Sequence, residues 1–207
     1  MVSTADRPLR ADAARNAERI LRAARDVYGE LGPDAPMETV ARRAGVGERT
    51  LYRRFPTKGD LISAALDQCI AEDLTPVIEQ ALRAKDPIRG FTALIEAAIS
   101  LGAREHNLLT AAQRAGSLAP DISASLDGAL YELARRGQTA GVVRADLVAE
   151  DIPRLIAMLH SVLFTMDSAR DGWRRYVALL LDAITVNRGR KLPPAPAIRF
   201  APDGWPL

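Results

Sequence analysis

The chain has 207 residues, 48% of them hydrophobic and 5% aromatic, and it carries a formal net charge of +2. This length suits one large domain or a small domain joined to a larger one. A single cysteine, Cys69, excludes an internal disulfide framework. The N-terminal residues contain no apolar signal core and no apolar run is long enough to cross a bilayer, so we expect a cytoplasmic protein without a membrane partner.

The charge is distributed unevenly along the chain. Residues 1–60 contain 12 Lys and Arg against 9 Asp and Glu, whereas residues 61–207 contain 16 against 17. A positive excess towards the N-terminal end is compatible with a module that faces DNA, although an ordinary solvated surface has the same composition.

Helix-forming residues dominate the chain, and no segment shows the alternating polarity of a half-buried strand. The expected fold class is therefore all-α, with a core of Leu, Ile, Val and Ala. Residues 1–12 are expected to form an arm, and residues 191–207 a proline-rich tail that is not helical. Apolar periodicity and Gly or Pro punctuation predict helices at 13–31, 37–44, 48–55, 61–74, 77–84, 87–104, 106–115, 121–140, 149–167 and 171–188.

The most informative segment is residues 37–61, METVARRAGVGERTLYRRFPTKGDL. Two short helices that cross steeply need a turn of three or four residues, in which Gly45 suits a left-handed position. Ala41, one helical turn earlier, allows the two backbones to approach closely. The apolar residues expected between the helices are Val40, Ala44, Val46, Leu51 and Phe55. This layout predicts a helix-turn-helix.

The same helical phase predicts which side chains of the second short helix face outwards. If Leu51 and Phe55 point inwards, then Glu48, Arg49, Tyr52 and Arg53 face solvent, with Thr50 and Arg54 on the flanks. Arg can bind guanine edges in a major groove, and hydroxyl groups can reach phosphate oxygens. The alternative is an amphipathic helical hairpin with a solvated basic face.

Residues 13–73 resemble the DNA-binding domain of the tetracycline-repressor (TetR) family. The resemblance rests on the apolar phase of the first helix, on A-x-x-A-G-V at 41–46, on T-L-Y at 50–52 and on F-P-T-K at 55–58. It implies a DNA-binding domain at 13–60, a ligand-binding and dimerisation domain at 61–190, and operator DNA as a partner. The family's DNA contacts, transferred by position, fall on Thr39, Glu48, Arg49, Thr50, Tyr52, Arg53, Arg54 and Lys58.

One feature departs from the family pattern. Many relatives carry small or apolar residues where this chain has Glu48 and Arg49. Glu48 either accepts a hydrogen bond from a cytosine amine or pairs with Arg49, and the sequence does not choose between these roles.

The last two predicted helices are more apolar than one core face requires, which predicts a surface that a partner covers. The resemblance implies a homodimer through a four-helix interface. The expected interface residues are Ile152, Leu155, Ile156, Leu159, Leu163, Tyr176, Val177, Leu180, Leu181 and Ile184. The alternative is that both helices are wholly buried within one subunit.

The resemblance also implies a small-molecule effector bound among the middle helices. The pocket candidates are Phe91, Leu94, Ile95, His106, Gln113, Tyr131, Met158, His160 and Phe164. An isolated histidine on an apolar helix is more often satisfied by a protein partner than by a ligand, which is the competing interpretation of both histidines.

Nothing in the sequence favours an enzyme. The chain has two histidines and one cysteine, and it lacks zinc-protease, serine-hydrolase and phosphate-loop motifs. We expect no cofactor and no metal. The predicted function is a ligand-responsive repressor that binds a palindromic operator as a homodimer. The alternatives are an effector-independent DNA-binding protein and an activator of the same fold.

Overall fold

The computed structural model describes residues 6–117, 120–163, 165 and 172–186. Within these residues the only β-type pairing is an isolated antiparallel bridge between Val143 and Thr185, so the all-α prediction is confirmed. The elements are α1 (Asp6–Leu31), α2 (Met37–Ala44), α3 (Glu48–Arg54), α4 (Lys58–Cys69), the π-turn η1 (Ile70–Leu74), α5 (Thr75–Arg83), α6 (Pro87–Arg104), α7 (His106–Arg114), α8 (Pro120–Thr139), α9 (Asp151–Leu163) and α10 (Trp173–Ile184).

The chain divides into two compact units. The first comprises residues 1–68 and 105–118, and the second comprises 69–104 and 119–207. The expected boundary at 60/61 thus lies eight residues earlier than the structural one, and α7 belongs with the N-terminal helices. The proline-rich tail, 191–207, lies outside the described residues.

Helix α1 begins at Asp6, seven residues before the expected start, so much of the expected arm is helical. The segment lacks apolar periodicity because it is rich in Ala, Arg and Asp. Alanine and arginine nevertheless favour helix, and Pro8 lies in the first turn, where a missing N–H costs nothing.

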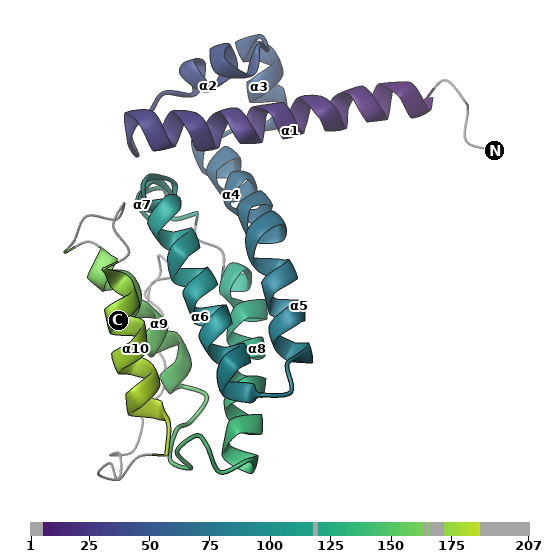
Figure 1. Ribbon diagram of the computed structural model, residues 1–207. Coiled ribbons are helices and arrows are strands. Elements are labelled where there is room, and N and C mark those ends of the chain that lie inside the picture. The colour runs from purple at the N-terminus through teal and green to yellow at the C-terminus, as the bar shows by residue number, and fades with distance from the viewer. Residues whose placement is uncertain (1–5, 118–119, 164, 166–171, 187–207) are drawn as a thin grey trace. The chain divides into compact units, whose positions relative to one another are not determined.

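The first unit is built on the buried face of α1. Ile20, Ala24, Val27 and Tyr28 on that face are at most 1% exposed. Helix α1 lies across α2 and α3 (Figure 1).

Helix α7 is joined to the first unit by polar contacts with α1 and with the loop that follows it. The Arg25 guanidinium pairs with Glu105 at 2.7 Å, next to the start of α7. The Asn107 amide donates a hydrogen bond to the Gly29 carbonyl at 3.1 Å. Near the end of the helix, Arg114 pairs with Asp34 at 2.9 Å.

The second unit is built around α6. Its buried face includes Phe91, Leu94 and Ile95, and α6 packs against α5, α8, α9 and α10. Gly102 of α6 faces His160 of α9 so closely that a Cβ at residue 102 would lie 2.8 Å from the imidazole Nε2. A larger residue at this position would therefore displace the His160 ring.

The predicted break at Pro76 takes the form of a π-turn. Proline has no N–H to continue the α-helical ladder, and its ring displaces the preceding turn. In the structure both the N–H and the hydroxyl of Thr75 donate to the Ile70 carbonyl. The chain therefore continues as helix from α4 through η1 into α5 without an open loop.

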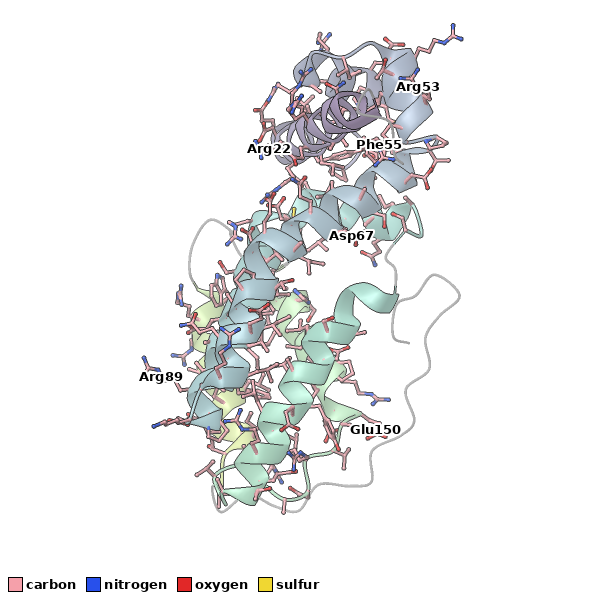
Figure 2. The ribbon with its side chains drawn as sticks, turned by 90° about the vertical axis from the view of Figure 1, so that its right-hand side faces the viewer. Arg22, Arg53, Phe55, Asp67, Arg89 and Glu150 are labelled. Carbon is pink, nitrogen blue, oxygen red and sulfur yellow. The ribbon has the colours of Figure 1, made fainter. Side chains whose placement is uncertain are left out.

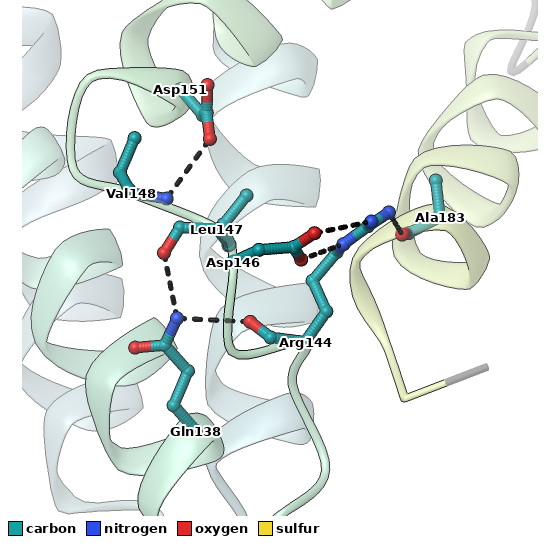
Figure 3. A network of polar contacts seen from close by, with 7 residues as sticks. All are labelled: Gln138, Arg144, Asp146, Leu147, Val148, Asp151 and Ala183. Carbon is teal, nitrogen blue, oxygen red and sulfur yellow. Dashed lines mark hydrogen bonds and ion pairs between the residues drawn. The ribbon is translucent and has the colours of Figure 1, made fainter. Parts of the chain in front are cut away.

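The connector between α8 and α9 is ordered by a polar network (Figure 3). The Gln138 amide donates to the carbonyls of Arg144 at 3.0 Å and Leu147 at 2.8 Å. Arg144 pairs with Asp146 and also donates to the Ala183 carbonyl at 3.3 Å. The connector thereby attaches α8 to the end of α10.

Candidate nucleic-acid interface

The turn between α2 and α3 has the predicted geometry. Gly45 adopts φ 65° and ψ 36°, the left-handed region in which side chains are strained. The Val46 N–H donates to the Ala41 carbonyl at 3.0 Å, and Ala41 is 1% exposed. The turn and the small residue beneath it therefore form the expected helix-turn-helix.

Helix α3 has an apolar inner side and a charged outer side. Leu51 is fully buried, and Phe55, which ends the helix, is extended because Pro56 follows it. Figure 2 shows Arg53 projecting away from the first unit, whereas Phe55 lies against the neighbouring helices. The side chains exposed on α3 are Glu48, Arg49, Tyr52, Arg53 and Arg54, as the helical phase predicts, and Thr50 is half-buried.

Not every arginine near this face is available to a ligand. Arg43 of α2 forms a two-pronged ion pair with Glu30, at 2.9 and 2.6 Å. Arg54 lies over the Phe55 ring, 5.7 Å from its centroid. Within the described residues Arg49 and Arg53 have no such partner. Arg49 and Arg53 are therefore exposed without a partner in the described part of α3, and Arg54 is exposed with one face against the Phe55 ring.

Tyr52 has a partner that the sequence did not suggest. Its hydroxyl donates a hydrogen bond to the Glu38 carboxylate at 3.0 Å, which joins α3 to the first turn of α2. This hydrogen bond raises the pKa of Tyr52. No helical periodicity relates residues 38 and 52, so only the three-dimensional crossing of the helices reveals the contact.

The two remaining predicted contacts are half-buried. Thr39 lies in the first turn of α2. The Lys58 ammonium donates to the Pro33 carbonyl at 3.1 Å and lies 5.4 Å from the centre of the buried Tyr28 ring. At the start of α4, the Asp60 carboxylate accepts hydrogen bonds from the Thr57 N–H and hydroxyl. The Lys58 ammonium and the Thr57 amide therefore both have partners within the chain.

Arg19 of α1 is a further residue at this site that the sequence reasoning missed. Its guanidinium donates to the Ala44 and Gly45 carbonyls, at 2.9 and 3.2 Å, directly at the turn. Arg19 lies on the polar side of an amphipathic helix, where an arginine is normally solvated, so no sequence signal distinguishes it.

The structure does not bring the predicted pocket residues together as a set. Phe91, Leu94 and Ile95 are buried on α6, but Tyr131 and Met158 are 48% and 64% exposed. His106 and Gln113 belong to the first unit, and Phe164 lies outside the described residues.

His160 has a protein partner. Burial lowers the pKa of the His160 imidazole, and a hydrogen bond between the imidazole and the backbone of Ala98 on α6 acts in the opposite direction. This contact corresponds to the competing interpretation, in which the histidine is satisfied by the protein.

The predicted dimer residues are divided between an inner and an outer face. The buried ones are Ile152, Ile156, Leu159, Leu163, Val177 and Ile184, and the half-buried ones are Leu155, Leu180 and Leu181. Tyr176 is exposed. Met158 of α9 and Leu179 of α10 are 64% and 52% exposed, although neither was assigned to the interface. Both helices therefore carry exposed apolar side chains on their outer faces and are not wholly buried within the described subunit.

Comparisons with known proteins identify the helix-turn-helix. The model of bacterial regulatory proteins of the tetR family matches residues 20–65. A solved TetR regulator from Mycobacterium vanbaalenii is 32% identical, with 86% of this chain and 100% of that chain covered and a TM-score of 0.59. The chain belongs to the TetR family. A TetR regulator from Streptomyces coelicolor is 30% identical, with 82% and 98% covered and a TM-score of 0.58.

A third TetR-like structure has a ligand. LfrR from Mycobacterium smegmatis, solved in complex with proflavine, is 22% identical, with 82% of this chain and 94% of that chain covered and a TM-score of 0.56. A search of curated protein sequences finds no match. Within the described part of this TetR-family chain, no helix is both long and apolar enough to span a membrane.

Proposed function

We propose that this TetR-family chain is a repressor that binds a palindromic operator as a homodimer and is released by a small molecule. The observation that carries the proposal is the outer face of α3, where Arg49 and Arg53 have no partner within the described residues. Each guanidinium presents a fork of donors that matches guanine O6 and N7 in a major groove. Thr39, Thr50 and Tyr52 supply hydroxyl groups for the phosphate backbone.

Lys58 would also contact a phosphate, in exchange for its hydrogen bond to the Pro33 carbonyl. The Asp60 carboxylate occupies the start of α4, where a phosphate would otherwise bind, so Lys58 is the weakest member of the proposed set. Glu48 remains assigned either to a cytosine amine or to Arg49.

The homodimer is supported by the outer faces of α9 and α10. Tyr176 and Leu179 lie one turn apart on α10, and both are at least 41% exposed. Leu155 and Met158 have the same spacing on α9. Helices that leave such side chains in water gain free energy when a second copy covers them. The proposed interface therefore uses these outer faces, and the buried members of the predicted set support it from within.

Release by a small molecule is supported by the fold. A relative of the same fold was solved with proflavine, which binds that relative.

The affinity of the proposed effector and that of DNA must be linked. A ligand can lower operator affinity by no more than its own preference for the DNA-incompetent state, typically about 5- to 150-fold. Calorimetric titration of a hit from a thermal-shift screen of small apolar compounds, with and without operator, tests this. Equal affinities in the two titrations would remove the sensing role and leave DNA binding intact.

A mobility-shift experiment tests DNA binding itself. The probe is the duplex upstream of the protein's own coding sequence, and a scrambled duplex of equal composition is the control. We expect a shift of the first duplex at concentrations that leave the second one free. A reporter gene downstream of the same segment distinguishes a repressor from an activator, because reporter expression falls in one case and rises in the other.

A further inference from the structure

Helix α3 is held by little apolar packing. It has seven residues, of which Leu51 alone is fully buried, and neither end has a side-chain cap. The C-cap residue Phe55 is also buried, so apolar packing fixes the inner side of this short helix through only two side chains. We therefore expect other contacts to contribute to how α3 is presented to DNA.

The turn that carries α3 is intrinsically permissive. It consists of Gly45, Val46 and Gly47, so two of its three residues lack a Cβ and lose the most backbone freedom on ordering. The Val46 N–H donates to the Ala41 carbonyl, which fixes the start of the turn. No side chain caps Gly47, at its end.

Arg19 supplies the missing constraint from outside the motif. Its Nη2 donates to the Ala44 and Gly45 carbonyls at 2.9 and 3.2 Å, and its Nε lies 3.3 Å from the Ala44 carbonyl. Carbonyl groups at a helix C-terminus lack intrahelical partners and carry partial negative charge. A planar guanidinium is suited to two adjacent carbonyls because its donors form a rigid fork.

We infer that Arg19 is a positioning residue for operator recognition. Its guanidinium holds the carbonyls of the turn and so sets the direction of α3 towards the base pairs, while it makes no contact with DNA itself. This inference rests on the proposed function, because it concerns how the DNA-binding face is presented. The polar contact of α3 itself, between Tyr52 and Glu38, lies on the first turn of α2 and does not involve the turn between the two helices.

The test compares Arg19→Ala and Arg19→Lys with Arg22→Ala. Arg22 is an exposed arginine on the same helix with no partner in the described residues. Arg22→Ala therefore removes one positive charge, as Arg19→Ala does, but removes no hydrogen bond. The probes are a duplex that the wild-type protein selects from a random pool and a scrambled duplex. Affinities for both are measured over a range of salt concentrations, and circular dichroism confirms that each variant is folded.

For Arg19→Ala we expect operator affinity to fall roughly tenfold below that of Arg22→Ala, because two charge-assisted contacts are lost. Affinity for the scrambled duplex and the slope of affinity against salt should equal those of Arg22→Ala. Arg19→Lys should fall between wild type and Arg19→Ala, since an ammonium restores the charge without the fork. In the free protein, hydrogen exchange of the Val46 amide should be faster in Arg19→Ala than in Arg22→Ala.

Four results overturn the inference. A salt slope about one unit shallower than that of Arg22→Ala would make Arg19 a phosphate contact. Equal operator preference in the two alanine variants would show that the turn needs no constraint. If Arg19→Ala does not fold, the test uses Arg19→Lys in its place. A preference of Arg19→Lys for operator over scrambled duplex equal to that of wild type would then reject the positioning role of Arg19. If the wild-type protein selects no duplex, the proposed function fails and this inference fails with it.

Discussion

The two units of the chain leave different residues at their surfaces. Among the described side chains of the first unit, the exposed large apolar residues are Leu31 and Tyr52, and Tyr52 has a polar partner. In the second unit they are Leu82, Tyr131, Val142, Val148, Met158, Tyr176, Leu179 and Val186. The first unit therefore leaves Leu31 as its one large apolar side chain exposed without a polar partner among the described residues, whereas the second unit exposes several.

This difference indicates two kinds of partner. A unit that exposes few apolar side chains and whose helix α3 presents arginines is suited to a polyanion, because opposite charges supply the binding affinity. A unit with apolar side chains exposed on its last two helices is suited to a protein surface, because burial of those side chains supplies the binding affinity. The expected effects of mutation differ accordingly, and each prediction below addresses one side of the contrast.

The largest effect is expected from Leu179→Glu on α10. If a second copy covers this position, the variant buries a carboxylate without a partner, at a cost of about 3–5 kcal/mol. Dimerisation should weaken by roughly 100-fold or more. Sedimentation should show monomers, and operator binding should be lost with the dimer. Leu180 is a less specific choice because it is half-buried within its own subunit.

Leu82→Glu is the matched control for that variant. Leu82 is an exposed leucine on α5 of the same unit, so the same charge is introduced away from α9 and α10. This variant should stay dimeric. Monomers from Leu82→Glu, or an unchanged dimer from Leu179→Glu, would place the interface elsewhere.

On the DNA side, Arg49→Ala or Arg53→Ala should cost about 1–3 kcal/mol of operator affinity and relax the preference at one base pair. The reason is loss of a bidentate contact to a base edge. Arg43→Ala is the control because Arg43 is paired with Glu30. The measurement is the affinity of each variant for operator duplexes in which one base pair at a time is substituted. An unchanged base preference in both Arg49→Ala and Arg53→Ala would mean that α3 presents another face to DNA.

The sequence predicted the helix-turn-helix almost residue by residue because its determinants are local. Gly45 must adopt a left-handed conformation, and Leu51 and Phe55 recur at helical spacing. It did not predict the inner and outer faces of α9 and α10, because Ile156 and Met158 are equally apolar and only packing against α6 distinguishes them. The contacts of Arg19 and Glu38 likewise join residues 25 and 14 positions apart.

Packing inside the second unit gives a third prediction. Gly102→Ala should destabilise the fold by about 1–3 kcal/mol, because its Cβ would lie 2.8 Å from the His160 ring and the core must shift. Gly128→Ala on α8 is the control, since nothing lies within 4 Å of a Cβ there. Chemical denaturation measures both. Equal stability of the two variants would mean that α6 and α9 are less closely packed than the structure shows.

The smallest expected effect is a dependence of stability on pH. Burial lowers the pKa of His160 below its ordinary value of 6.5 in the folded chain, so the unfolded chain binds the proton more readily. Stability should therefore fall as pH decreases below about 6.5, by at most about 1.4 kcal/mol per pH unit for one proton. Unfolding at pH 7.5 and 5.5 should show a smaller difference for His160→Gln than for wild type. An identical difference would assign the dependence to other groups.

The central claim is that two copies of the chain present two α3 helices to DNA, and selection of duplexes from a random pool by the wild-type protein tests it most directly. The account predicts an enriched sequence with dyad symmetry and half-sites separated by about one helical turn, ~35 Å, or somewhat more. Enrichment of a sequence without a dyad, or no enrichment at all, would contradict it.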